Sequence, residues 1–393
     1  MDYNPFLPEV QKNPYPYYAY LREHAPVYHV AEVGFWAVSR YDDVLSLFKN
    51  PQMFSSDGLL SFFMGDLDPF PLEAPSIVAC DPPDHTRLRK LVNRAFTPRR
   101  VASLERHIRE VADQLLERIP RHGAFDLVKD LSAPFPTIVI AQLLGVPPER
   151  YADFKRWADS AVRAENGMAV PPEERMELRK NLSEMFAYFR SAVAACRQKP
   201  GDNLLSDLVR AEEENQTLTA AEITSLAVFL IMAGSETTTN LIGNAILALC
   251  AHPEQMAQVR ANPALILNVV EETLRYDAPV QSLARRTTQD ITVAGTRIPA
   301  GSSVLILVGS ANHDERKFPA PERFDIMRNT DGHLGFGFGI HFCLGAQLAR
   351  LEAKAALEAL LDRFPRLARL DDHVTRPETG SVRGPQTLPL AVQ

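Results

Sequence analysis

A single cysteine, Cys343, lies in the part of the chain best suited to chemistry. Glycines at positions 335, 337, 339 and 345 and alternating aromatic residues surround it, and strong helix formers begin at Ala346. A cysteine just before a helix N-terminus is stabilised as a thiolate. It could be a metal ligand, for which one cysteine suits haem better than zinc. A structural cysteine would not need four glycines, and a nucleophile would need a partner that the sequence does not identify.

A short run of polar residues interrupts an apolar stretch in the middle of the chain. Thr219 and Glu222 form a capping box, and His252-Pro253 ends the helical pattern. We therefore expect one helix of about 32 residues, roughly 48 Å long. Residues 234–240 place glycine, hydroxyls and a carboxylate in this helix. They predict either a local distortion in which polar groups move protons, or two shorter helices that meet at a solvated break.

A third motif is a pair of opposite charges. Glu272 and Arg275 lie three residues apart, on one face of a helix that we expect to start at Asn262-Pro263 and to stop at Asp277. Such pairs usually belong to solvated helix faces and stabilise little. This motif gains meaning only from its neighbours in the sequence.

Composition limits the class of protein. Of the 393 residues, 46% are hydrophobic and 23% are charged, as in a globular protein with a substantial core. The net charge of −7 argues against a general nucleic-acid binder. Four scattered cysteines match neither a zinc site nor a disulfide framework, which favours a reducing cytoplasm. We see no signal-peptide pattern, and the longest apolar stretch, 226–233, is too short to span a bilayer, so we expect a soluble protein.

The elements that must position these groups are mostly helical. Thr97-Pro98 predicts the start of a helix whose apolar residues recur from Val101 to Leu115. Strand-like segments are few, and they occur at 27–30, 35–38, 291–293 and 303–308. We therefore expect a mainly α protein with a small β portion, folded as a single domain over residues 1–393.

The cysteine loop, Phe336-x-x-Gly339-x-x-x-Cys343-x-Gly345, resembles the haem-binding loop of the cytochrome P-450 family. Three further family motifs stand in the right order: Ala233-Gly234-x-Glu236-Thr237-Thr238, Glu272-x-x-Arg275, and a proline-rich meander from Ala311 to Asp325. The resemblance extends from Asn4 to Pro385. It implies the cytochrome P-450 fold, with a long central helix over haem, in its soluble bacterial form.

The resemblance also implies roles for single residues. It makes Cys343 the iron ligand of haem b, Thr237 the hydroxyl that hydrogen-bonds dioxygen, and Glu236 the acid that relays protons. The implied haem contacts are His85, Arg89, Arg285, His341, Phe336 and Ala233, of which the first four would meet propionates. The adjacent Arg286 is the alternative to Arg285. Glu272, Arg275 and Arg323 would form a buried structural network. Substrate contacts would come from Phe62 and Phe63, in a proline-marked irregular loop, and from Val280 and Leu283.

The activity that the resemblance implies is that of a monooxygenase. It would activate dioxygen with two electrons and hydroxylate or epoxidise an apolar small molecule, such as a secondary metabolite, terpenoid, steroid or fatty acid. The alternatives are a peroxide-using haem-thiolate enzyme and a non-catalytic haem-binding protein, neither of which needs the relay of Glu236 and Thr237. A cysteine-dependent hydrolase is a further rival.

Electron donors leave a weaker trace in the sequence. Residues 85–109 hold eight Lys and Arg against one acid, Glu105, which indicates either a solvated helix face or a docking surface for an acidic ferredoxin. No flavin or nicotinamide motif is present, so we expect a separate ferredoxin and ferredoxin reductase. We expect a cytoplasmic monomer with no nucleic-acid or membrane partner.

Overall fold

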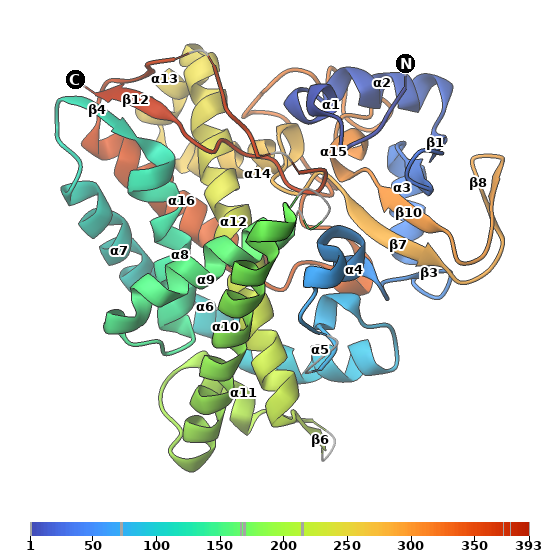
Figure 1. Cartoon of the computed structure of the whole chain (residues 1–393). Helices are drawn as coiled ribbons and strands as arrows, with labels where there is room; N and C mark the ends of the chain where they lie inside the picture. Colours follow the sequence, from blue (N-terminus) through green and yellow to red (C-terminus); the bar gives the residue numbers. More distant parts are fainter. Residues whose placement is uncertain are drawn as a thin grey trace. The chain divides into compact units, whose positions relative to one another are not determined.

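The computed structural model describes residues 2–70, 74–165, 167, 170–213, 216–371, 373–377 and 379–392. The chain divides into two compact units. Unit 1 comprises Met1–Ser55, Ala112–Ala133 and Thr237–Gln393, and unit 2 comprises Ser56–Val111 and Pro134–Glu236. Helices predominate among the described residues (Figure 1), as expected for a mainly α protein.

Unit 1 contains helices from both ends of the chain. They are α1 (Pro8–Lys12), α2 (Tyr15–His24), α3 (Tyr41–Lys49), α13 (Pro253–Ala261), α14 (Ile266–Tyr276), α15 (Val308–Ala311) and α16 (Ala346–Arg363). The start of α14 follows a short 3-10 turn, Pro263–Leu265, whose backbone N–H at Ala264 is capped by the Asn262 side chain. The predicted start and stop of this helix are confirmed.

A five-stranded sheet in unit 1 has the order β1-β2-β10-β7-β3. Its strands are β1 (Val27–Val30), β2 (Phe35–Val38), β3 (Phe54–Ser55), β7 (Leu283–Thr287) and β10 (Ser303–Ile306). β1 and β2 pair in antiparallel register as predicted, and Gly34 takes the left-handed conformation that their turn requires. β10 runs parallel to β2 and ends at Ile306, earlier than predicted, because α15 begins at Val308.

Smaller sheets complete unit 1. β8 (Ile291–Val293), which was predicted, pairs with β9 (Thr296–Ile298), and β4 (Gly123–Asp126) joins β11 (Leu367–Arg369) and β12 (Pro389–Val392). The five-stranded sheet packs against apolar side chains of α3 and the meander, and the centre of this core is fully buried at Val38, Val44, Val304 and Ile306. Burial of such side chains stabilises the unit by about 1.5–3 kcal/mol for each residue.

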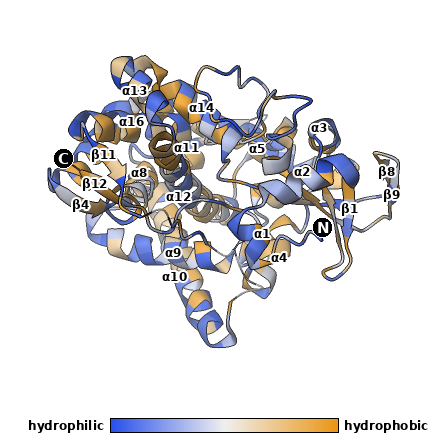
Figure 2. Cartoon of the chain, turned by 90° about the horizontal axis from the view of Figure 1, so that it is seen from above, coloured by the Kyte–Doolittle hydropathy of each residue, from blue (hydrophilic) through white to orange (hydrophobic). Residues whose placement is uncertain are grey.

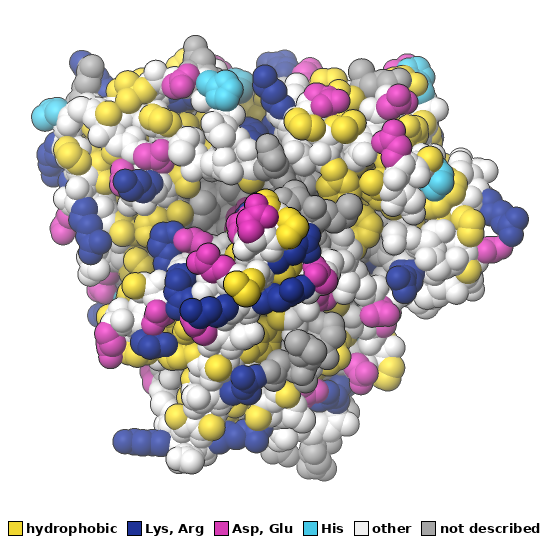
Figure 3. All heavy atoms as spheres, in the orientation of Figure 1, with side chains coloured by type: hydrophobic (Ala, Val, Ile, Leu, Met, Phe, Trp, Pro, Cys, Tyr) yellow, Lys and Arg dark blue, Asp and Glu magenta, His cyan; other side chains and the backbone are white. Residues whose placement is uncertain are grey.

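Unit 2 consists of helices and one short hairpin, β5 (Glu212–Glu213) with β6 (Gln216–Thr217). Its helices are α4 (Leu59–Met64), α5 (Asp84–Ala95), α6 (Pro98–Ser103), α8 (Pro134–Leu143), α9 (Tyr151–Ala164), α10 (Pro172–Gln198) and α11 (Leu204–Arg210). Ion pairs join α9 to α10, where Arg163 meets Glu174 at 2.9 Å and Arg156 meets Glu184 at 2.8 Å. Basic and acidic side chains are mingled over this region in Figure 3.

Two local predictions in unit 2 need correction. Residues 61–64 are helical, not irregular, because the prolines lie beyond them. Gly58 and Gly65, both with positive φ, lie at the two ends of this proline-free turn. The helix predicted from Pro98 to Leu115 is interrupted at Leu104, where α6 ends and α7 (Glu105–Glu117) begins. Its predicted cap is confirmed, since the Thr97 side chain accepts the N–H of Arg100 at 3.1 Å.

The central helix α12 runs without a break from Ala220 to Ala251. The capping box forms, with the Thr219 N–H donating to Glu222 at 2.8 Å and the Glu222 N–H donating back at 3.2 Å. The alternative of two shorter helices is therefore wrong. Among the described residues α12 is the one helix long and apolar enough to cross a membrane by length and composition (Figure 2), yet 56% of its most apolar window is buried within the protein, as in a core helix.

Candidate functional site

The cysteine loop is wound by backbone hydrogen bonds. The N–H of Cys343 donates to the carbonyl of Phe336 at 3.0 Å, and the N–H of Phe342 donates to Gly339 at 3.1 Å. The long helix α16 begins at Ala346, as predicted, so Cys343 lies two residues before its N-cap Gly345. The helix dipole and the first amides of α16 therefore favour a thiolate at Cys343.

Two glycines allow neighbouring backbone to press against this loop. A Cβ atom at Gly335 would lie 2.6 Å from the carbonyl oxygen of Leu274 in α14. A Cβ atom at Gly339, whose φ is +75°, would lie 2.7 Å from the carbonyl oxygen of Phe48 in α3. Both distances are shorter than van der Waals contact, so the path of the loop depends on glycine at both positions.

The chemistry of the available ligands fits haem. Among the residues described above, no group of three or more His, Cys, Asp and Glu is placed to hold a metal ion. A single thiolate such as Cys343 suits porphyrin iron, because the porphyrin supplies the other ligands. Cys343 is partly buried, which suits a ligand facing a cofactor.

The remaining predicted site residues are divided between the units. Unit 1 contains Thr237, Val280, Leu283, Arg285, Phe336, His341 and Cys343, and unit 2 contains Phe62, Phe63, His85, Arg89, Ala233 and Glu236. The helix α12 passes from unit 2 to unit 1 between Glu236 and Thr237, and both side chains are partly buried. His85 and Arg89 lie one turn apart on α5, as expected, and His85 is only 2% exposed.

The choice between Arg285 and Arg286 is clearer in the structure. Arg285 on β7 is buried, and its guanidinium lies 5.9 Å from the centre of the Phe48 ring, whereas Arg286 is exposed. Arg285 also donates a hydrogen bond to the backbone carbonyl of Ala284 at 2.8 Å. Val280 forms an isolated bridge with Val382, and Leu283 is partly buried at the start of β7.

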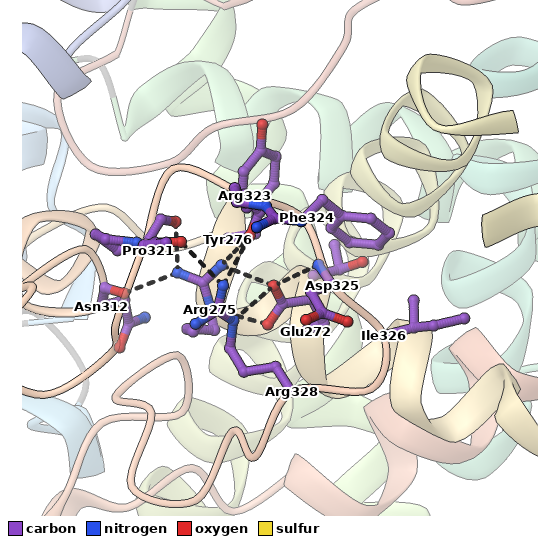
Figure 4. A network of polar contacts seen from close by, with 12 residues as sticks. Glu272, Arg275, Tyr276, Asn312, Pro321, Arg323, Phe324, Asp325, Ile326 and Arg328 are labelled. Atoms are coloured by element: carbon purple, nitrogen blue, oxygen red, sulfur yellow. Dashed lines mark hydrogen bonds and ion pairs between the residues drawn. The ribbon is translucent and has the colours of Figure 1, made fainter. Parts of the chain in front are cut away.

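The pair Glu272 and Arg275 is fully buried, with both side chains at 0% exposure. Two hydrogen bonds join the carboxylate to the guanidinium, at 2.7 and 2.8 Å (Figure 4). The same guanidinium also donates to the backbone carbonyls of the meander at Asn312, Pro321 and Arg323, at 3.1, 2.9 and 3.1 Å. This pair is therefore structural, because every polar group it buries is satisfied within the fold.

Arg323 does not play the role expected from the sequence. Its side chain is exposed and only its carbonyl enters the network, whereas Arg328 supplies the second cation, with Nε 3.3 Å from Glu272 Oε1. The N–H of Asp325 donates to the same carboxylate at 3.0 Å (Figure 4). Both arginines lie in an irregular segment, so no periodicity in the sequence distinguishes them.

One carboxyl group near the proton-relay residues was not singled out from the sequence. Glu165 is the C-cap of α9, in the same unit as Glu236. Burial raises the pKa of Glu165 well above its usual value, and the negative charge of Glu236 raises this pKa further. Both effects favour the protonated form of Glu165. Only its tertiary position, and no local motif, marks it.

These features agree with comparisons to known proteins. Residues 6–390 match the family model described as Cytochrome P450. The chain is 41% identical to Vitamin D(3) 25-hydroxylase of Pseudonocardia autotrophica, with 97% of this chain and 94% of that protein covered. It is 39% identical to Cyclomarin C epoxidase CymV of Salinispora arenicola, with 94% of each covered. Cytochrome P450 CYP109Q5 from Chondromyces apiculatus is similar in structure, with a TM-score of 0.94, 44% identity, and coverage of 100% and 98%.

The chain therefore belongs to the cytochrome P450 family. Its fold is the cytochrome P450 fold, its cofactor is haem iron, and its enzyme class is that of the monooxygenases. These four predictions, of family, fold, cofactor and enzyme class, are confirmed. Members of the family act on small molecules and receive electrons from redox partners.

Proposed function

We propose that this protein inserts one oxygen atom into an apolar small molecule at a haem held by the Cys343 thiolate. The observation that carries the proposal is the cysteine loop, in which glycine contacts, the Cys343–Phe336 hydrogen bond and the start of α16 together place a thiol at a helix N-terminus. Haem, when bound, supplies an iron centre at which dioxygen is activated by two electrons, and a thiolate ligand favours O–O cleavage.

The chain's own residues deliver the protons that this reaction consumes. We assign the donor hydroxyl to Thr237 and the proton-carrying carboxyl to Glu236, which adjoin each other on α12. We propose Glu165 as a source of protons for Glu236, because burial and the Glu236 charge both raise the pKa of Glu165 and both groups belong to unit 2. This relay argues for dioxygen over peroxide as the oxidant, because a peroxide-using enzyme has no need of it.

We assign the haem propionates to four basic side chains, since cations bind carboxylates by charge-assisted hydrogen bonds. These are His85, Arg89, Arg285 and His341, and Phe336 and Ala233 would contact the haem itself. Because His85 and Arg285 are buried, they gain most from an anionic partner. We propose that the two units together form the single cytochrome P450 domain expected over residues 1–393, since the family model extends across both.

The substrate is proposed to be a steroid-like molecule or another apolar secondary metabolite. One relative is named as a vitamin D(3) hydroxylase, another as a cyclomarin C epoxidase, and the solved CYP109E1 from Bacillus megaterium is described in complex with testosterone. Phe62, Phe63, Val280 and Leu283 are the proposed apolar contacts, and all four are partly buried. A library of such compounds, screened for a shift of the Soret band, would identify ligands that displace water from the iron.

Electrons are proposed to arrive from a soluble ferredoxin and its reductase in the cytoplasm. The basic segment 85–109 is less basic than its composition indicates, because several of its arginines form ion pairs. The pairs are Arg87–Glu222, Arg100–Asp202, Arg106–Glu110 and Arg109–Glu105. The proposed docking surface is the basic segment as a whole, and reduction by an acidic ferredoxin should then slow as ionic strength rises.

The test of the proposed function uses two variants of the holoenzyme. Cys343→Ser should abolish the red-shifted band of the reduced, carbon-monoxide-bound protein. Thr237→Ala should retain this band but divert electrons from product to hydrogen peroxide. Thr224→Ala is the matched control, because that hydroxyl lies on the same helix and donates back to the Ala220 carbonyl at 2.8 Å. Full coupling of electrons to product in Thr237→Ala would contradict the relay.

A further inference from the structure

A second polar cluster lies beside the cysteine loop, separate from the Glu272 network. Its centre is Glu271 in α14, whose carboxylate receives two hydrogen bonds from Arg350 in α16, at 2.5 and 2.9 Å. Adjacent residues of a helix point to different sides. Glu272 therefore faces the meander, while Glu271 faces α16. The cluster links two helices through residues 79 positions apart in the sequence.

His333 joins this cluster to the beginning of the cysteine loop. Its Nδ1 accepts the N–H of Gly335 at 3.1 Å, so the ring hydrogen lies on Nε2, which donates to Glu271 at 3.0 Å. Glu271 thus has a partner on each side. Burial raises the pKa of Glu271, but the hydrogen bonds from Arg350 and His333 outweigh it and hold this pKa at about 2. The carboxylate is charged at every working pH.

Arg350 connects the Glu271 cluster to the aromatic ring of Phe336. The guanidinium lies 4.5 Å from the centre of the ring, well within the range of a cation–π contact. Such contacts strengthen as they are desolvated. The two hydrogen bonds to Glu271 fix the plane of the guanidinium, and the guanidinium in turn fixes the ring.

Phe336 is in direct contact with Cys343, the proposed iron ligand. Its carbonyl accepts the N–H of Cys343 at 3.0 Å, and its ring lies 6.3 Å from that of Phe342, the neighbour of Cys343. The loop itself is rich in glycine and contributes little stiffness of its own. A clamp from outside the loop is therefore needed to hold the sulfur in one place.

We propose that Glu271, Arg350 and His333 are positioning residues that clamp Phe336 and thereby hold the Cys343 thiolate in register with the haem iron. This inference rests on the proposed function of Cys343. Lysine in place of Arg350 would keep the charge but lose the planar fork and the stack on the ring. Glutamine in place of Glu271 would keep the shape but lose the charge that orients Arg350.

The experiment compares Glu271→Gln, Arg350→Lys and the wild-type holoenzyme. Each is reduced under carbon monoxide, and the loss of the red-shifted band is followed with time, together with the midpoint potential of the iron. Glu271→Gln should lose the band about tenfold faster than the wild type, since an ion pair and an oriented cation–π contact are both weakened. Arg350→Lys should be intermediate, because it retains the ion pair. Both variants should shift the midpoint potential.

The control is Asp159→Asn, which removes the exposed ion pair of Asp159 with Lys155 on α9, far in sequence from the loop. It should leave the band, its lifetime and the potential unchanged. If Glu271→Gln fails to take up haem, Arg350→Lys alone tests the clamp by the same two measurements. A wild type with the thiolate band, beside two variants whose band lifetime and potential equal those of the control, would overturn the clamp while leaving the proposed function intact. A wild type without the band would overturn both.

Discussion

Substitution of Arg275 by lysine tests whether the buried pair of Figure 4 is as costly to disturb as its geometry indicates. The guanidinium makes five hydrogen bonds, to the two carboxylate oxygens of Glu272 and to three backbone carbonyls. A lysine ammonium has only three N–H groups on one nitrogen. At least two buried acceptors therefore lose their donor, in a place where no water reaches either side chain.

The size of the effect follows from these losses. Each lost charge-assisted hydrogen bond costs about 1.5 kcal/mol or more, so the free energy of unfolding should fall by about 3 kcal/mol. An unfolding entropy of about 2.1 cal/mol/K per residue converts this into a decrease in Tm of about 4 °C if the chain unfolds cooperatively. The decrease is larger if unit 1 unfolds alone, because fewer residues then share the transition.

The assay is thermal unfolding followed by circular dichroism, with haem content measured on the same samples. Asp159→Asn serves again as the control, since it removes an exposed pair and should cost about 0.5 kcal/mol or less. Arg328→Lys should lie between the two, because Arg328 touches Glu272 only from the rim of the network at 3.3 Å. If Arg275→Lys lowered the Tm no more than the control, the view of this network as the structural centre of the meander would be refuted.

Two further outcomes can be measured in the same way. Burial lowers the pKa of His313 from 6.5 to about 3. As the pH falls, His313 is therefore protonated in the unfolded chain before it is protonated in the folded protein. The free energy of unfolding should then decline below pH 6.5 by up to about 1.4 kcal/mol per pH unit. Urea titrations should show a shallower decline in His313→Gln, and an unchanged slope would refute this origin. Gly339→Ala should lower both Tm and haem content, because its Cβ would meet the Phe48 carbonyl at 2.7 Å in a left-handed conformation.

Local signals in the sequence were sufficient for much of the site. The capping box at Thr219, the stop before Pro253 and the helix after Cys343 depend on residues within one or two turns of each other, and all three are present in the structure. Such signals act through hydrogen bonds and dihedral preferences that the neighbouring chain decides alone. For the same reason the polar centre of α12 and the glycine-rich loop could be read as chemistry before any fold was known.

The sequence by itself thus determined the elements, the family motifs and the identity of Cys343 as the candidate ligand. Only the tertiary structure decided which distant groups meet them. Arg328 takes the place expected for Arg323, Glu271 reaches Arg350 across two helices, and residues 61–64 form a helix despite the prolines that follow. No periodic pattern in the sequence indicates which residue a charged side chain in a loop will contact. The fold of the whole chain determines its partner. A buried charge is costly unless it is paired, so it pairs with an opposite group that the fold places nearby.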